Sequence, residues 1–167
     1  MASIKCDFFQ VAVPQNCGRT FEQLINEVAQ MPDDETRTVE WYDKTLIRLR
    51  GVLKTDGVLL GEMVRTEMEN LPSKSNRKGV ISRLNLADDE GTARRTHFLY
   101  HEPTKTIVIH KSQTGVAPRA IRHYFEGFCG CAGIAFSPWL DTAAMKKLAG
   151  SDGFRSLEVT VATTANL

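Results

Sequence analysis

The chain has 167 residues, with 21 Lys and Arg against 20 Asp and Glu, and its formal net charge at pH 7 is +1. This length suits one domain with its own core, and hydrophobic and charged fractions of 42% and 25% are ordinary for a soluble globular protein. No apolar run approaches the ~18–20 residues that cross a bilayer, and the first ten residues lack the apolar core of a signal peptide. Composition excludes a helical membrane protein, and we expect a cytoplasmic protein with no membrane partner.

The balanced total conceals an uneven distribution of charge along the chain. Residues 1–73 hold 8 Lys and Arg against 12 Asp and Glu, a net charge of −4. Residues 74–122 hold 10 against 4, a net charge of +6, and residues 123–167 hold 3 against 4, a net charge of −1. A basic middle segment is typical of a polyanion site and also of a solvated basic face, so charge alone does not choose between these interpretations.

The N-terminal half contains one well-signalled helix among predicted strands. Residues 4–13 are rich in β-branched and aromatic types and predict a strand. Thr20 and Gln23 have the spacing of a capping box, and Pro32 ends the helix that follows. The apolar residues of this helix recur at helical spacing and predict one buried stripe. The stripe consists of Phe21, Leu24, Ile25 and Val28.

Three more strands are predicted at 37–42, 45–54 and 58–67, and a Thr55-Asp56-Gly57 turn joins the last two as a hairpin. Alternation divides the middle strand into a buried face and a solvated face. The predicted buried face consists of Ile47, Leu49 and Leu53, and the predicted solvated face of Leu46, Arg48, Arg50 and Val52.

The C-terminal half predicts a polar, flexible loop at 69–79, an acidic turn at 88–91 and a hairpin around Pro103. The predicted strands are 80–86, 96–101, 106–111, a short 134–139 and 154–163. The predicted helices are 118–128, which begins at Pro118, and 142–149. Hairpins outnumber strand-helix alternations, so we expect an α+β fold with a mainly antiparallel sheet of about seven strands and three helices packed on it. We expect residues 1–167 to form a single domain, or the N-terminal domain of a longer protein.

Basic residues of the middle segment form the candidate nucleic-acid site. They lie in the flexible loop, before the second hairpin and early in the helix at 118–128, whose free N–H groups suit a phosphate. If these segments converge, they form a surface that reads the backbone of DNA without strong sequence preference. The predicted phosphate contacts are Lys74, Arg77, Lys78, Arg94, Arg95, Arg119 and Arg122.

Other constellations give weaker signals. Cys129-Gly130-Cys131 is a single tight pair, Cys6 and Cys17 lie far from it in sequence, and we expect reduced thiols and no metal site. His97 and His101 share one strand face without a catalytic partner. We therefore expect no catalytic residues, no cofactor and no enzymatic activity. Two alternatives stay open, namely a protein-binding module that uses hairpin edges and the acidic first segment, and a metal-dependent nuclease that uses Asp88, Asp89 and Glu90.

One stretch of the middle and C-terminal segments resembles a known family. The motifs are LNLADDEG at 84–91, THFLYH at 96–101, Ile107-Val108-Ile109, Gly115, Ile121 and Tyr124. Their order over 84–125 resembles the N-terminal region of bacterial and phage proteins related to RexA of the phage-exclusion system. The DNA-binding subunit of the Kiwa defence system is similar in general arrangement, and the element order resembles these proteins over the whole chain.

The resemblance implies an antiparallel α+β domain of a phage-defence or phage-exclusion protein that is a homo-oligomer and binds DNA non-specifically. Members close this region with a strand near a Ser-Pro pair, here Ser137-Pro138. This chain is much shorter than such proteins, so no C-terminal DNA-binding or oligomerising part is carried over. No catalytic residue is carried over either, because the resemblance supplies none.

Overall fold

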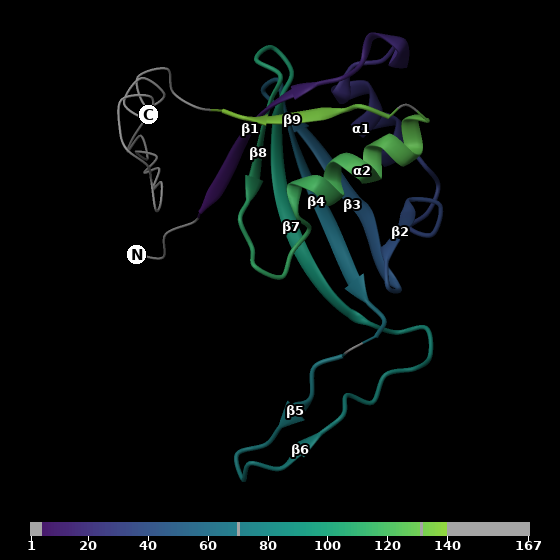
Figure 1. Ribbon diagram of the computed structural model, residues 1–167, viewed down its shortest axis with the longest axis vertical. Coiled ribbons are helices and arrows are strands. Elements are labelled where there is room, and N and C mark those ends of the chain that lie inside the picture. The colour runs from purple at the N-terminus through teal and green to yellow at the C-terminus, as the bar shows by residue number, and fades with distance from the viewer. Residues whose placement is uncertain (1–4, 70, 131, 140–167) are drawn as a thin grey trace, which may run out of the picture.

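A computed structural model describes residues 5–69, 71–130 and 132–139. Seven antiparallel strands form one sheet in the order β2-β3-β4-β7-β8-β1-β9, and a separate ribbon pairs β5 with β6 (Figure 1). The strands are β1 Cys6–Ala12, β2 Thr38–Tyr42, β3 Thr45–Thr55, β4 Val58–Glu67, β5 Lys74–Ser75, β6 Ile81–Ser82, β7 Thr92–His101, β8 Thr106–His110 and β9 Ala135–Pro138. The helices are α1 Phe21–Ala29 and α2 Pro118–Cys129, with a 3-10 turn at Gln15–Cys17.

This architecture confirms the predicted α+β class and the antiparallel sheet of seven strands. The described residues contain two α-helices, whereas three were predicted. The third predicted helix, 142–149, and the predicted strand 154–163 lie outside the described residues.

The first helix forms as its sequence predicts. The Thr20 hydroxyl accepts the Gln23 N–H at 3.2 Å, and the Gln23 side chain accepts the Thr20 N–H at 2.7 Å. This reciprocal pair satisfies two N–H groups that a helix start leaves free. All four residues of the predicted stripe are buried, so α1 is held on the sheet by one apolar face.

The core lies between α1, α2 and one face of the curled sheet, which we call the inner face (Figure 1). The Phe21 ring packs edge-on against Tyr100, Phe125 and Phe136 at centroid distances of 5.1, 4.9 and 5.7 Å. The Tyr124 hydroxyl donates to the Arg37 carbonyl at 2.6 Å and accepts the Leu49 N–H at 3.0 Å. Helix α2 is thereby fixed to β3 and to the segment before β2.

One predicted face is wrong beyond the middle of β3. Leu49 pairs with Met63 and Gly51 pairs with Glu62, so Arg50 is an extra residue that interrupts the register. A bulge of one residue reverses the alternation of everything after it. Val52 therefore packs against the core, and Leu53 lies on the opposite, outer face with 63% of its surface exposed.

The predicted strand at 80–86 is also wrong in extent, because only Ile81–Ser82 is extended and paired. The reason lies in the neighbours of β4. This strand pairs with β3 on one side and with β7 on the other, from Val58↔His101 to Glu67↔Thr92. No edge of β4 is left for residues 80–86, which leave the sheet and pair locally with β5.

Candidate nucleic-acid interface

The chain between β4 and β7 projects from the end of the sheet as an extended hairpin, which we call the arm and define as residues 71–87 (Figure 1). Two pairs, Lys74↔Ser82 and Ser75↔Ile81, hold its two segments together. Almost all residues of the arm are exposed. The arm is therefore a narrow two-stranded ribbon that contributes nothing to the core.

The tip of the arm is a tight turn built by Asn76. Its side-chain oxygen accepts the N–H groups of Lys78 at 2.9 Å and Val80 at 3.1 Å, and Gly79 adopts a positive φ of 79°. An Asn side chain that replaces a backbone acceptor in this way stabilises a turn, and Gly takes the left-handed position without strain. The turn leaves the Arg77 and Lys78 side chains exposed at the tip.

All charged side chains of the arm are positive. They are Lys74, Arg77, Lys78 and Arg83. Each is exposed, and none forms an ion pair with any residue that the structure describes. Arg83 is absent from the predicted contacts, because it lies within the predicted strand 80–86 and was assigned to the sheet. Its place in the basic segment is the signal that identifies it.

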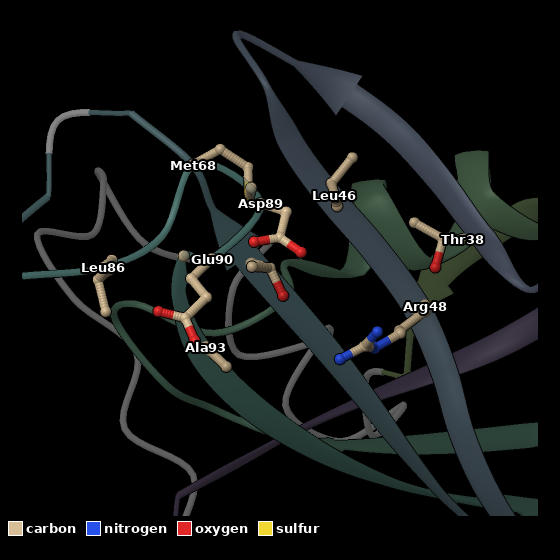
Figure 2. Close-up of a pocket in the computed structure, with 10 residues that line it drawn as sticks. Thr38, Leu46, Arg48, Met68, Leu86, Asp89, Glu90 and Ala93 are labelled. Carbon is tan, nitrogen blue, oxygen red and sulfur yellow. The ribbon is translucent and has the colours of Figure 1, made fainter. Parts of the chain in front are cut away.

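The acidic turn predicted at 88–91 lies at the base of the arm. Asp89 and Glu90 line a cavity of about 380 Å³ between the arm and the outer face of the sheet, opposite Arg48 (Figure 2). The Glu90 carboxylate accepts the Ala87 N–H at 2.9 Å. Asp88 instead lines a neighbouring cavity with Glu40 and Glu69.

This division of the carboxylates bears on the nuclease alternative. Within the described residues no group of three or more His, Cys, Asp or Glu side chains is arranged to hold a metal ion.

Cys6 and Cys17 are free thiols, and burial, followed by the Asp7 charge, raises the pKa of the Cys6 thiol. The side chains of Cys129 and Cys131 lie outside the described part of the structure.

Arg94 and Arg95, adjacent in β7, lie on opposite faces of the sheet. Arg94 pairs with Arg65 of β4 on the inner face, near the end where the arm begins. Arg95 lies on the outer face opposite Val64, which Arg48 flanks from β3. Val64 is only 3% exposed although neither of the two described helices packs on this face. The stems of long basic side chains cover apolar neighbours in this way.

The outer face gathers cations around one carboxylate that the sequence did not single out. Glu62 of β4 lies 3.3 Å from Arg50, 3.9 Å from Arg95 and 3.2 Å from His97. His97 and His101 share this face as predicted but have different partners, because the His101 Nδ1 lies 2.8 Å from the Thr104 hydroxyl. The two histidines therefore do not form a pair.

Arg119 and Arg122 lie on the first turns of α2. The cap residue Ala117 supplies no side-chain hydrogen bond, and the Val116 N–H donates to the Thr96 hydroxyl at 2.7 Å. Thr96 is two residues from Arg94 on the inner face, so α2 begins beside the Arg65–Arg94 pair. The Nε atoms of Arg65 and Arg122 are buried and have no hydrogen-bond partner in the described structure.

The seven predicted contacts thus fall into three places. Lys74, Arg77 and Lys78 come together on the arm. Arg94, Arg119 and Arg122 lie on the helix side of the sheet near the same end, and Arg95 lies on the outer face. The basic segment is divided between two faces and an arm, and the arm is its most concentrated part.

Comparison with known proteins places this antiparallel α+β protein with its basic arm in a family. The family model described as "Family of unknown function (DUF6731)" matches residues 2–167, and the chain belongs to this family. No curated protein and no solved structure matches it. No helix among the described residues is long and apolar enough to cross a membrane. The likeness of residues 84–125 to RexA-related proteins stays a sequence-based prediction.

Proposed function

We propose that this protein binds DNA through backbone phosphates, without strong sequence preference and without catalysis, and that the arm is its principal contact. The observation that carries the proposal is the arm itself. Four exposed cations lie on a projecting two-stranded ribbon that has no acidic side chain and no ion pair within the described residues. A role in phage exclusion or defence belongs to the proposal through the resemblance alone.

The shape of the arm suits a duplex. The major groove is about 12 Å wide and admits a two-stranded β-ribbon. Lysine and arginine side chains on both segments of such a ribbon reach the phosphates of the two groove walls, and each contact releases a condensed counterion. Val80 and Ile81, exposed at 59% and 72%, lie beside the tip turn, where apolar side chains contact sugars and thymine methyl groups.

The inner-face arginines supply a second contact at the same end of the sheet. Arg65 and Arg94 face each other across two strands, an arrangement that like charges destabilise. Glu67 pairs with Arg65 at 2.6 Å, which leaves Arg94 as the member of this pair without an ion pair in the described structure. A bound phosphate removes the repulsion and supplies an acceptor for the guanidinium groups.

A matched pair of variants tests this function. In the arm variant, Lys74, Arg77, Lys78 and Arg83 are each replaced by Gln. The control variant also loses four positive charges, but from side chains in the body of the protein that already form ion pairs. The control replaces Arg19, Lys44, Lys54 and Lys111 by Gln.

Affinity is measured by fluorescence anisotropy with a labelled random-sequence duplex at low salt. We expect the arm variant to bind about 100-fold more weakly than the wild type, and the control variant less than about 3-fold more weakly, because the arm cations contact phosphates and the four paired body cations do not. Absence of wild-type binding, or equal losses in the two variants, would refute the proposal. Cleavage of the duplex in the presence of Mg²⁺ or Mn²⁺ would instead favour the nuclease alternative.

A further inference from the structure

The cavity of about 380 Å³ between the arm and the outer face of the sheet, which we call the base cavity, is not used by the proposed DNA contacts (Figure 2). Its volume lies within the range of small-molecule sites, about 300–1,000 Å³. One wall is formed by outer-face residues of the sheet, and the other by residues at the base of the arm. A molecule in this cavity therefore contacts both parts of the protein.

The two walls carry opposite charges that do not meet. Arg48 lies on the sheet wall, and Asp89 and Glu90 lie on the arm wall (Figure 2). None of these three side chains forms an ion pair with any residue that the structure describes. The cavity thus separates a guanidinium from two carboxylates, and a ligand that carries both signs of charge can pair with each wall.

The Arg48 guanidinium has unused hydrogen-bond donors. Its Nε is buried and has no hydrogen-bond partner in the described structure. A buried donor without an acceptor costs free energy, and most such groups in proteins have a partner. The planar guanidinium presents parallel N–H groups that match the two oxygens of a carboxylate. The sheet wall therefore suits a carboxylate of the ligand.

The arm wall suits an ammonium group. An ammonium carries three N–H donors and no acceptor, so it needs several oxygens around it. The Asp89 carboxylate accepts no hydrogen bond from the described residues, and Glu90 uses one oxygen for the Ala87 N–H and keeps the other. Between the two charged walls the cavity is lined by aliphatic side chains, which suit an apolar part of the ligand. They include Leu46, Met68 and Leu86.

We infer that the base cavity binds a free α-amino acid with an apolar side chain. The carboxylate of the amino acid pairs with Arg48, and its ammonium group pairs with Asp89 and Glu90. A nucleotide phosphate would also suit Arg48, but it would bring about two negative charges next to the two carboxylates. The zwitterion brings one charge of each sign and avoids this repulsion. The inference is independent of DNA binding, because ligand binding is measured without nucleic acid.

Isothermal titration calorimetry with matched probes tests the ligand class. L-Leucine carries both charged groups, N-acetyl-L-leucine lacks the ammonium, and L-leucinamide lacks the carboxylate. We expect leucine to bind with a Kd between about 10 µM and about 1 mM, and each analogue to bind at least about 10-fold more weakly. Failure of leucine, methionine and phenylalanine to bind at up to about 10 mM would overturn the inference. Equal binding of leucine and its analogues, or tighter binding of adenosine monophosphate, would also overturn it.

Two variants test the place of binding. Arg48→Met removes the guanidinium and keeps an apolar stem over Val64, and Asp89→Asn keeps the shape of an exposed side chain and removes its charge. We expect each to weaken leucine binding at least about 10-fold.

The matched control is Arg50→Gln, which removes a guanidinium from the same strand. Arg50 pairs with Glu62 and does not line the cavity, so leucine binding should stay within about 2-fold of the wild type. Asp89→Asn keeps the test decisive even if Arg48→Met is unstable, because Asp89 is exposed and contributes nothing to the core. Wild-type affinity for leucine in Asp89→Asn, or an equal loss in Arg50→Gln, would overturn the assignment of the base cavity.

Discussion

The body of the protein and its arm differ in burial and in the pairing of their charges. In the body, apolar side chains of both helices and most strands form one buried cluster, and every ion pair of the described residues lies outside the arm. In the arm nothing is buried beyond the half-buried positions near its base, and the four cations have no ion-pair partner in the described structure. The residues that stabilise the fold are therefore different from the residues that carry the unpaired positive charges.

The separation has a physical basis in strand pairing. Since β4 and β7 complete each other's hydrogen bonds over their full length, the chain that connects them has no position in the sheet. Free of packing requirements, this segment can consist of polar and basic residues. Substitutions in the body should therefore change the free energy of unfolding, and substitutions in the arm should change DNA affinity.

The largest effect is expected from Phe125→Ala. Phe125 is fully buried and its ring contacts both Phe21 and Tyr124. The cavity left behind should lower the free energy of unfolding by about 3–5 kcal/mol, measured by urea denaturation. DNA affinity of the folded fraction should stay unchanged. A parallel loss of affinity under conditions where the variant is folded would break the separation between body and arm.

Gly61→Ala is expected to have the next largest effect. A Cβ at this position would lie 2.1 Å from the Phe98 ring, which is itself buried. Overpacking should lower the free energy of unfolding by about 2–3 kcal/mol. At Gly51, the matched control, a Cβ would meet nothing within 4 Å. Gly51→Ala should therefore stabilise the strand by up to about 1 kcal/mol, and equal effects at both positions would contradict this packing.

Tyr124→Phe isolates one buried hydroxyl. Its removal leaves the Leu49 N–H and the Arg37 carbonyl without this partner, at a cost of about 1–2 kcal/mol near neutral pH. Burial raises the pKa of Tyr124 from 10.0 to about 12, although the Leu49 N–H and Arg37 act in the opposite direction.

The raised pKa fixes the sign of a pH effect. The neutral hydroxyl contributes its full stabilisation below pH 10, and this contribution is lost as the pH rises from about 10 through about 12. The wild type should lose free energy of unfolding over this range more steeply than Tyr124→Phe. Identical alkaline profiles for the two proteins would show that Tyr124 is not the group responsible. Burial also raises the pKa of Tyr100, which adds to the alkaline loss in both proteins.

The smallest effect concerns a single arm residue. Arg77→Gln removes one exposed cation from the tip turn without touching the Asn76 hydrogen bonds. DNA affinity at low salt should fall about 3- to 10-fold, and the free energy of unfolding should stay within about 0.5 kcal/mol of the wild type. Lys54→Gln is the comparison, since its Nζ lies 2.6 Å from Glu22 in the body. An equal loss of affinity in both would mean that net charge alone governs binding.

The sequence predicted what short-range patterns determine. The capping box at Thr20 and Gln23, the stripe of α1 and the hairpin at Thr55-Asp56-Gly57 depend on neighbours within a few residues, and the structure confirms them. Leu53 was assigned to the wrong face because no local signal marks Arg50 as a bulge. The predicted strand at 80–86 was too long, because β3 and β7 pair with both edges of β4 and leave no edge for these residues.

The candidate site shows the same limit. Counting charge by segment found Lys74, Arg77 and Lys78, since a run of cations in a polar stretch is visible without a structure. Arg94 and Arg95 were predicted to act together because the predicted strand began only at residue 96. In the structure β7 begins at Thr92, so these neighbouring residues point to opposite faces of the sheet. The position of Arg94 opposite Arg65 depends on the register of strands that are far apart in sequence.

The salt dependence of duplex binding tests the central claim most directly, because its slope counts phosphate contacts and is insensitive to small changes of fold. The logarithm of the association constant is measured against the logarithm of salt concentration for the wild type and for the two variants that each lack four cations. We predict that removing the four arm cations lowers the magnitude of the slope by roughly 3–4, and that removing the four paired body cations lowers it by less than about 1. Equal slopes for the wild type and the arm variant would contradict the assignment of the arm as the nucleic-acid contact.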